Sequence, residues 1–331
     1  MYRIEQLQSY QIKELAEFMA SSNFLWNDFE LLKYIVKNLS YRIEDNVVVT
    51  YKGKIVGCNL YIRTLAIING EIRTIRWSHS TYLAPEHRKS IGLEFFINSL
   101  STNDIWGFGL TETNRRIHKL NGTTFCGESH AYIICPSFIQ CPNLSYQLNC
   151  SELQKEYIFP YNYEIDGKKY IKCLSPEDHR MPNGGFWNPT ILNVDFVRNQ
   201  EFMKKRFYNF SNKYNIYRAH KDSSYDDSYF VFKVKSIKGT PAIFLVDYRF
   251  NLSDHSGLSA ILDSLCYLAS LNAIDCIYFF TTLPTEYIYS NYGIISPYGN
   301  KADIITNSLN VTEQCMMMVT PADSDSELIP L

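Results

Sequence analysis

The sequence predicts an α/β protein made of two similar halves, and three observations support this. The chain has 331 residues, more than a typical single domain holds and enough for two. Segments with helical spacing alternate with β-branched segments of strand-like composition. The order of these segments, and of the turns between them, recurs at a nearly constant offset along the chain.

Composition limits the kind of protein this is. Hydrophobic residues make up 46% of the chain, enough to bury sizeable cores, and 32 basic residues balance 34 acidic ones. A dedicated nucleic-acid binder normally has a basic excess, so we expect no nucleic-acid partner. The chain has no secretory leader pattern and no apolar run of about 18 residues, so we expect a cytoplasmic protein without a membrane partner. The nine cysteines form no Cys-x-x-Cys pair, so we expect reduced thiols and no metal.

The first half begins with an amphipathic segment and continues as a meander of strands. Ile12, Leu15 and Met19 recur at helical spacing, and Asn69-Gly70 is a strong hairpin signal because a type I′ turn needs two residues with positive φ. The expected elements are, in order, a helix at 11–20, strands at 46–51, 55–67 and 72–83, a helix at 91–100, a strand at 104–110, a helix at 114–120 and a strand at 125–135.

The second half repeats this order. Strands are expected at 229–234, 242–250 and 275–282, and a helix at 256–271. The turn signals Asn69-Gly70 and Lys238-Gly239 lie 169 residues apart, and the strands that start at Asp104 and Asp275 lie 171 apart. Such a constant offset indicates duplication, against the alternative of two unrelated α/β halves that look alike by chance.

A proline-rich stretch separates the halves. Residues 136–190 contain six prolines and Gly184-Gly185, with a small hairpin expected at 163–173 around Asp166-Gly167. We therefore expect a first domain at 1–135, a connecting segment at 136–190 and a second domain at 191–331.

The segment that carries chemistry lies between the third strand and the next helix. We expect a turn containing Arg88 and Gly92, where unpaired backbone N–H groups and the positive end of the helix dipole would suit a pyrophosphate. Gly92 would let the backbone approach closely, and Arg88 would add positive charge. Taken alone, this turn is better explained as an ordinary strand–helix junction with a surface arginine.

Its context resembles the GNAT (Gcn5-related N-acetyltransferase) superfamily over about residues 1–135. Pro85-Glu86-His87-Arg88 matches the Pro-x-x-Arg of that family, and Asn114 with Gly122–Phe125 is similar to its close after the fifth strand. The chain departs at positions 91 and 93, where the family has glycine and this sequence has Ile91 and Leu93. Residues 195–331 are similar only in element order.

The resemblance implies a fold of two tandem GNAT-like domains with one acyl-coenzyme A (acyl-CoA) site, in the first half, because the second half lacks Pro-x-x-Arg. The cofactor contacts that it implies are Tyr82, Leu83, Arg88, Lys89, Ser90, Ile91, Gly92 and Asn114. Attack by an amine on a thioester needs a base, an oxyanion donor and an acid for the thiolate. The candidates for the catalytic groups are Ser78, His79, Ser80, Glu112 and His118, with Ser78 and Ser80 on the strand face opposite to His79 by alternation.

The double arrangement resembles bacterial N-acyltransferases of nucleotide-linked amino sugars, including dTDP-linked ones, that serve surface polysaccharide synthesis. This implies a small nucleotide-sugar acceptor, for which Trp187, Tyr248 and Arg249 are the candidate contacts, and a second domain that shapes the acceptor pocket. Two alternatives stay open, a FemABX-like transferase that uses aminoacyl-tRNA and a non-catalytic module that binds coenzyme A or a nucleotide. The oligomeric state is not predicted.

Overall fold

The computed structural model describes most of the chain in two compact units. The described residues are 1–22, 29–39, 42–101, 104–109, 112–136, 156–179, 181–209, 214–220, 228–237, 240–299, 301–313 and 315–323. Unit 1 contains the described residues of Met1–Gly127 and Asp303–Cys315, with Asp323. Unit 2 contains those of Glu128–Ala302 and Met316–Ala322. This division differs from the sequence-based one, because the end of the chain contributes to both units.

Unit 1 is built on a mixed sheet in the order β1-β2-β3-β4-β5-β15-β6. The strands are β1 (Tyr2–Gln6), β2 (Val47–Tyr51), β3 (Lys54–Ile68), β4 (Glu71–Leu83), β5 (Ile105–Phe108), β15 (Ala302–Thr306) and the first residues of β6 (Thr124–Pro136). Neighbours among β1 to β4 are antiparallel, β4 and β5 are parallel, and β15 pairs antiparallel with β5. The turns Lys52-Gly53 and Asn69-Gly70 have positive φ at both residues, and the hairpin predicted at Asn69-Gly70 is confirmed.

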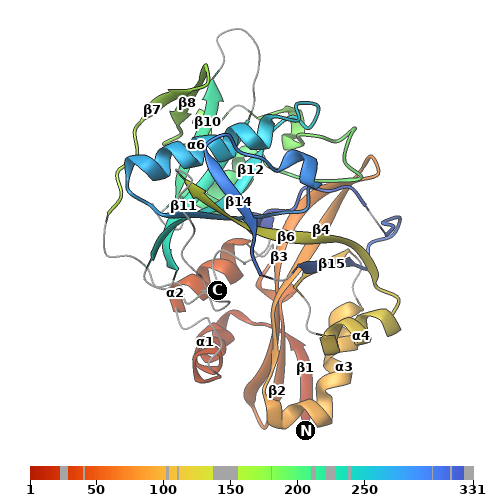
Figure 1. Ribbon diagram of the computed structural model, residues 1–331. Coiled ribbons are helices and arrows are strands. Elements are labelled where there is room, and N and C mark those ends of the chain that lie inside the picture. Colours follow the sequence, from red (N-terminus) through yellow and green to blue (C-terminus); the bar gives the residue numbers. More distant parts are fainter. Residues whose placement is uncertain are drawn as a thin grey trace. The chain divides into compact units, whose positions relative to one another are not determined.

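The described residues of unit 1 include the helices α1 (Ile12–Ser21), α2 (Phe29–Tyr34), α3 (Arg88–Leu100) and α4 (Glu112–Leu120). α1 buries Ile12, Leu15 and Met19, as its spacing predicts. α3 packs Ile91 and Phe95 against the sheet, and α3 lies next to α4, where Phe96 meets His118 (Figure 1). The helices therefore anchor β4 at the end where the candidate site lies.

Unit 2 repeats the scheme with a sheet in the order β6-β13-β12-β11-β10-β8-β7. Its strands are β7 (Asn162–Ile165), β8 (Lys168–Lys172), β10 (Asn215–His220), β11 (Tyr229–Ile237), β12 (Thr240–Arg249), β13 (Cys276–Thr281), the rest of β6, and β14 (Gly293–Pro297), which pairs with β6. A further short strand is β9 (Val194–Phe196). Helix α6 (Gly257–Leu271) packs its buried leucines on the aromatic face of this sheet (Figure 1). Helix α5 spans Gln200–Met203.

The predicted duplication appears in the topology. In unit 1 the antiparallel pair β3–β4 leads into α3 and then into β5, which is parallel to β4. In unit 2 the antiparallel pair β11–β12 leads into α6 and then into β13, which is parallel to β12. The hairpin at Asp166-Gly167 is also confirmed, with φ of 49° and 74°. The predicted turn at Lys238-Gly239 lies outside the described residues.

The start of α3 and the state of Cys135 differ from the sequence-based expectations. Helix α3 starts at Arg88, three residues before the predicted start, because Pro85–His87 already form a 3-10 turn with proline in its first position. Cys135 is disulfide-bonded, so the expectation of reduced thiols fails at that residue. Among the described residues, no helix combines the length and the apolar character that crossing a membrane requires.

Candidate functional site

The candidate site of unit 1 starts where β4 and β5 separate. Their last pair is Ser78 with Gly107, yet β4 continues to Leu83. β4 thus extends past its last described pair with β5, towards the start of α3.

A β-bulge distorts β4 at the same place. The register with β3 shifts between Cys58 and Leu60, so that Ser80 and Thr81 together oppose the single residue Asn59. Ser80 has a φ of 50°, in the left-handed region. Cys58 Sγ donates a hydrogen bond to the Ser80 carbonyl at 3.5 Å, which holds the bulge from the β3 side.

The side chains of β4 do not alternate as predicted, because the bulge interrupts the strand. His79 is buried, and its Nδ1 lies 3.1 Å from Ser80 Oγ. Ser80 therefore contacts His79 instead of pointing away with Ser78. Ser78 joins a different group, since its Oγ donates to Asn59 Oδ1 at 2.9 Å. Of the predicted trio, the structure brings two residues together and separates the third.

The helix end beside the bulge also differs from the prediction. Arg88 opens α3, and its Nε donates to the Leu83 carbonyl at 2.9 Å while its guanidinium lies over the Tyr82 ring at 5.7 Å. A Cβ built on Gly92 would meet its nearest neighbours, Leu83 Cδ2 and Arg88 Cβ, at 3.7 and 3.9 Å, which are ordinary contacts. Packing therefore does not require a glycine there.

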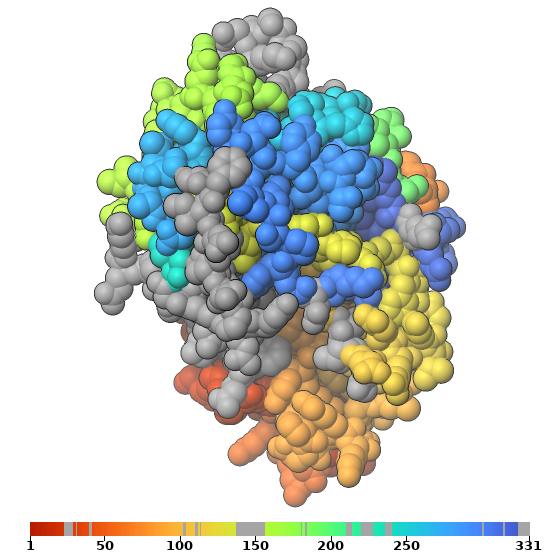
Figure 2. All heavy atoms as spheres, viewed as in Figure 1, coloured from red at the N-terminus to blue at the C-terminus, as the bar shows by residue number. Residues whose placement is uncertain are grey.

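The first turn of α3 is open to solvent. Arg88, Lys89 and Ser90 are exposed, whereas Ile91 is buried in the core of the unit. In space-filling form, α3 and α4, coloured orange to yellow, lie at the surface (Figure 2). The side chain of the N-cap residue, His87, makes no capping bond; it accepts from or donates to Tyr2 Oη at 3.0 Å instead. Two cations at an uncapped, exposed helix start suit an anionic group.

The three candidates on α4 have different surroundings. Glu112 is exposed and paired with Arg116 at 2.6 Å. Asn114 is half-buried. His118 is 6% exposed, with Nδ1 3.2 Å from Thr123 Oγ1, and burial lowers its pKa to about 4. His118 is therefore neutral at physiological pH and packed, so a role as acid would need a change of its surroundings; that role stays a prediction.

The corresponding helix end in unit 2 is occupied by the chain itself. Asp254 Oδ1 accepts from the Ser256 amide at 2.9 Å and from its hydroxyl at 2.6 Å, beside the start of α6. Gly257 follows, and a Cβ there would lie 2.3 Å from Phe250 Cδ2. A carboxylate at this end disfavours an anionic ligand there.

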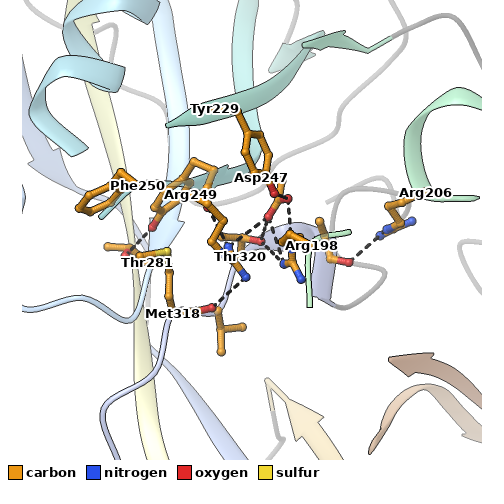
Figure 3. Close-up of polar contacts among 12 residues, drawn as sticks. Arg198, Arg206, Tyr229, Asp247, Arg249, Phe250, Thr281, Met318 and Thr320 are labelled. Atoms are coloured by element: carbon orange, nitrogen blue, oxygen red, sulfur yellow. Dashed lines mark hydrogen bonds and ion pairs between the residues drawn. The ribbon is translucent and has the colours of Figure 1, made fainter. Parts of the chain in front are cut away.

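The predicted acceptor residues are mostly interior. Tyr248 is fully buried and donates to Thr281 Oγ1 at 2.6 Å, and Arg249 is fully buried and donates to the Tyr248 and Met318 carbonyls (Figure 3). Trp187 is half-buried, with its ring edge-on to Tyr229 at 5.4 Å. Tyr248 and Arg249 as they stand cannot stack on an acceptor, because no part of either side chain reaches the surface.

Sequence reasoning missed the ionic cluster around Arg249. Arg198 and Asp247 are fully buried, and Arg198 Nε donates to Asp247 Oδ2 at 2.8 Å (Figure 3). Tyr229 and Thr320 also donate to this carboxylate, each at 2.6 Å. Burial alone would raise the pKa of Asp247, but the two arginines hold it below its usual value. Asp247 and Thr320 lie 49 and 122 residues from Arg198 in the sequence, so no local sequence pattern indicates the cluster.

A surface cavity of about 520 Å³ lies elsewhere in unit 2, and no predicted site residue lines it. Its walls are His179, Met181, Pro182, Gly184, Gly185, Asn199, Gln200 and Glu201. The described residues of its walls include one acidic side chain, Glu201.

Comparison with solved structures shows the fold. A GCN5-related N-acetyltransferase from Anabaena variabilis superposes with a TM-score of 0.56 at 12% identity, over 92% of this chain and 72% of that one. An N-myristoyltransferase from Saccharomyces cerevisiae with bound myristoyl-CoA and inhibitors gives 0.57 at 10% identity, over 98% and 83%. A probable N-acyltransferase from Enterococcus faecalis gives 0.55 at 8% identity, over 93% and 73%.

The chain therefore has the GNAT fold, and the predicted fold class is confirmed. No protein-family profile matches the chain, and no curated protein matches it in sequence. Identities of 8 to 12% show the fold alone. Function has to be argued from the site.

Proposed function

We propose that the protein transfers an acyl group from acyl-CoA to an amine and that unit 1 binds the acyl donor. The observation that carries this proposal is the separation of β4 from β5 at Ser78 and Gly107, directly before the exposed start of α3. A thioester chain can lie beside the end of β4 that extends past its last pair with β5, with its diphosphate at the cationic helix end. Solved structures of this fold include one with bound myristoyl-CoA.

The chemistry that these residues supply is acyl transfer without a covalent enzyme intermediate. A backbone N–H near the end of β4 would stabilise the oxyanion that forms when the amine attacks the thioester carbonyl. His79, at the bulge, would take the proton of the amine directly or through water. The thiolate of coenzyme A would take its proton from solvent, because buried His118 is neutral at physiological pH.

The acceptor that we propose is the amine of a nucleotide-linked amino sugar destined for a surface polysaccharide. The resemblance of the doubled arrangement to such N-acyltransferases supports this choice. Of the candidate contacts, Trp187 fits best, because its indole Nε1 is buried without a hydrogen-bond acceptor among the described residues. A peptide amine is the second candidate, because the likeness extends to an N-myristoyltransferase over 98% of the chain.

Two measurements test the function. Calorimetric titration with acetyl-CoA measures binding, and thiol release from acetyl-CoA is followed with a panel of amines: dTDP-amino sugars, peptides with a free N-terminus, and simple primary amines. Binding with amine-dependent thiol release supports the proposal, and the best amine identifies the acceptor class. A protein that binds no acetyl-CoA and releases no thiol would contradict it, and binding of tRNA would favour the aminoacyl-tRNA alternative.

Replacement of Arg88 tests the anion site. Arg88→Ala removes a charge at the helix start, so the Kd for acetyl-CoA should rise by roughly ten- to hundredfold. Arg116→Ala is the matched control, since Arg116 is an exposed arginine on α4 that is paired with Glu112. Equal Kd values for both variants and the wild type would remove Arg88 from the donor site.

A further inference from the structure

We propose that Ser78 and Thr81 form a site that accepts hydrogen bonds from an N–H group of a substrate, and that Asn59 and Tyr61 fix the polarity of this site. The inference rests on the proposed function, because it assigns one contact of that reaction. Thr81 was not among the residues predicted from the sequence. The four side chains form a continuous hydrogen-bonded chain from α3 to the β4 bulge.

The direction of each bond follows from the far end of the chain. The backbone carbonyl of Ser99, on α3, can only accept, so Tyr61 Oη donates to it at 3.1 Å. Burial raises the pKa of Tyr61 to about 12, so this hydroxyl keeps its proton. The Tyr61 oxygen must then accept from the next member, Asn59 Nδ2, at 2.7 Å. This contact decides which end of the Asn59 amide faces Tyr61.

The other end of the amide faces the bulge. Asn59 Oδ1 accepts from Ser78 Oγ at 2.9 Å and from Thr81 Oγ1 at 2.8 Å. Each hydroxyl has one hydrogen, and both hydrogens are used on Asn59. The two hydroxyl oxygens, 3.2 Å apart, therefore present lone pairs side by side. Two neighbouring acceptors are best satisfied by a donor, which indicates an N–H group.

Burial separates the fixed part of the chain from its open end. Asn59 and Tyr61 are each 2% exposed, so water does not compete for their bonds. Ser78 is half-buried and Thr81 is exposed. Ser78 is also the last β4 residue paired with β5. The acceptor pair thus lies at the mouth of the strand separation, where both substrates of the proposed reaction would meet.

Two substrates of that reaction carry suitable N–H groups: the attacking amine and the amides of the acyl-CoA arm. The test compares the wild type with the double variant Ser78→Ala/Thr81→Val. The measured quantities are the KM for the best amine and the Kd for acetyl-CoA. Loss of two hydrogen bonds should raise one of them about tenfold. A higher KM identifies the amine as the donor, and a higher Kd identifies the acyl-CoA amides.

Two further variants sharpen the test. Thr74→Val, on the same strand but outside the hydrogen-bonded chain, should leave both constants unchanged. Tyr61→Phe keeps both hydroxyls but removes the group that orients the Asn59 amide, so it should weaken the same constant about threefold. Thermal unfolding of each variant shows whether it is folded.

The outcomes separate the two proposals. An active wild type whose double variant changes both constants by less than about twofold overturns the acceptor site and leaves the function standing. A folded wild type that neither binds acetyl-CoA nor releases thiol overturns the function, and the site assignment falls with it.

Discussion

Several buried polar contacts of unit 2 converge on Asp247. Its carboxylate accepts from Arg198, Arg249, Tyr229 and Thr320, and Arg198 also lies 4.3 Å from the centre of the Phe202 ring. Removing the carboxylate would leave Asp195 as the acidic group that still interacts with both buried arginines. We expect Asp247→Asn to lower the free energy of unfolding by about 3–5 kcal/mol, measured by urea denaturation.

A surface ion pair of the same unit gives the control. Glu201 and Lys205 lie 2.7 Å apart, with exposed fractions of 70% and 48%. Glu201→Gln should change the free energy of unfolding by less than about 1 kcal/mol. If both substitutions had equally small effects, the Asp247 cluster would contribute no more than a solvated pair.

Among the elements, the β3–β4 pair packs tightly around Gly57. A Cβ on Gly57 would lie 2.7 Å from Leu83 Cδ1 and 3.1 Å from the Tyr82 carbonyl oxygen, so Gly57→Ala must displace the end of β4. Gly92→Ala meets no such neighbour and removes a glycine from a helix interior. We expect Gly92→Ala to stabilise the protein by about 0.5–1 kcal/mol and Gly57→Ala to destabilise it.

Gly92→Ala also tests the role of Gly92 in acyl-CoA binding. If a diphosphate needs a bare backbone at Gly92, the Kd for acetyl-CoA rises in the stabilised variant. An unchanged Kd would leave Gly92 out of the site. For Gly57→Ala, unaltered thermal unfolding and catalysis would show that β4 adjusts to the extra methyl group.

The elements also show what a sequence can predict. Asn69-Gly70 and Asp166-Gly167 identify their hairpins because the turns need positive φ, which these residues adopt most readily. The bulge on β4 leaves no such mark, since Ser80 takes a positive φ only because β3 holds it there. The early start of α3 had a visible signal in Pro85, which suits a first helical turn and was assigned to the preceding loop.

For the whole molecule, element order was predictable and the division into units was not. Unit 1 completes its sheet with β15, which comes from the end of the chain, and unit 2 begins its sheet with Glu128–Pro136 of β6. Both contributions depend on pairing between segments far apart in sequence, for example Ile304 with Phe108. The spacing of hydrophobic residues predicts which residues form a strand. It does not predict which distant strand they pair with, because that pairing is set only on folding.

The pH dependence of stability is a property of both units together, because each contains a histidine whose pKa burial lowers. Burial lowers the pKa of His118 in unit 1 and that of His179 in unit 2 from 6.5 to about 4. Between these values the unfolded chain binds protons that the folded chain refuses, so stability falls as pH falls from about 6.5 to about 4. Asp195 acts in the opposite sense, since burial raises its pKa.

Urea midpoints measured at intervals from pH 7.5 to pH 4.5 should therefore decline on the acid side, with the slope that proton linkage sets for the uptake of about two protons on unfolding. The variant His118→Gln/His179→Gln, which cannot take up these protons, should show a flatter decline even if its midpoint at pH 7.5 is lower. A wild-type midpoint that stays constant down to pH 4.5 would mean that both imidazoles reach solvent in the folded state. A decline of equal slope in the double variant would assign it to other groups.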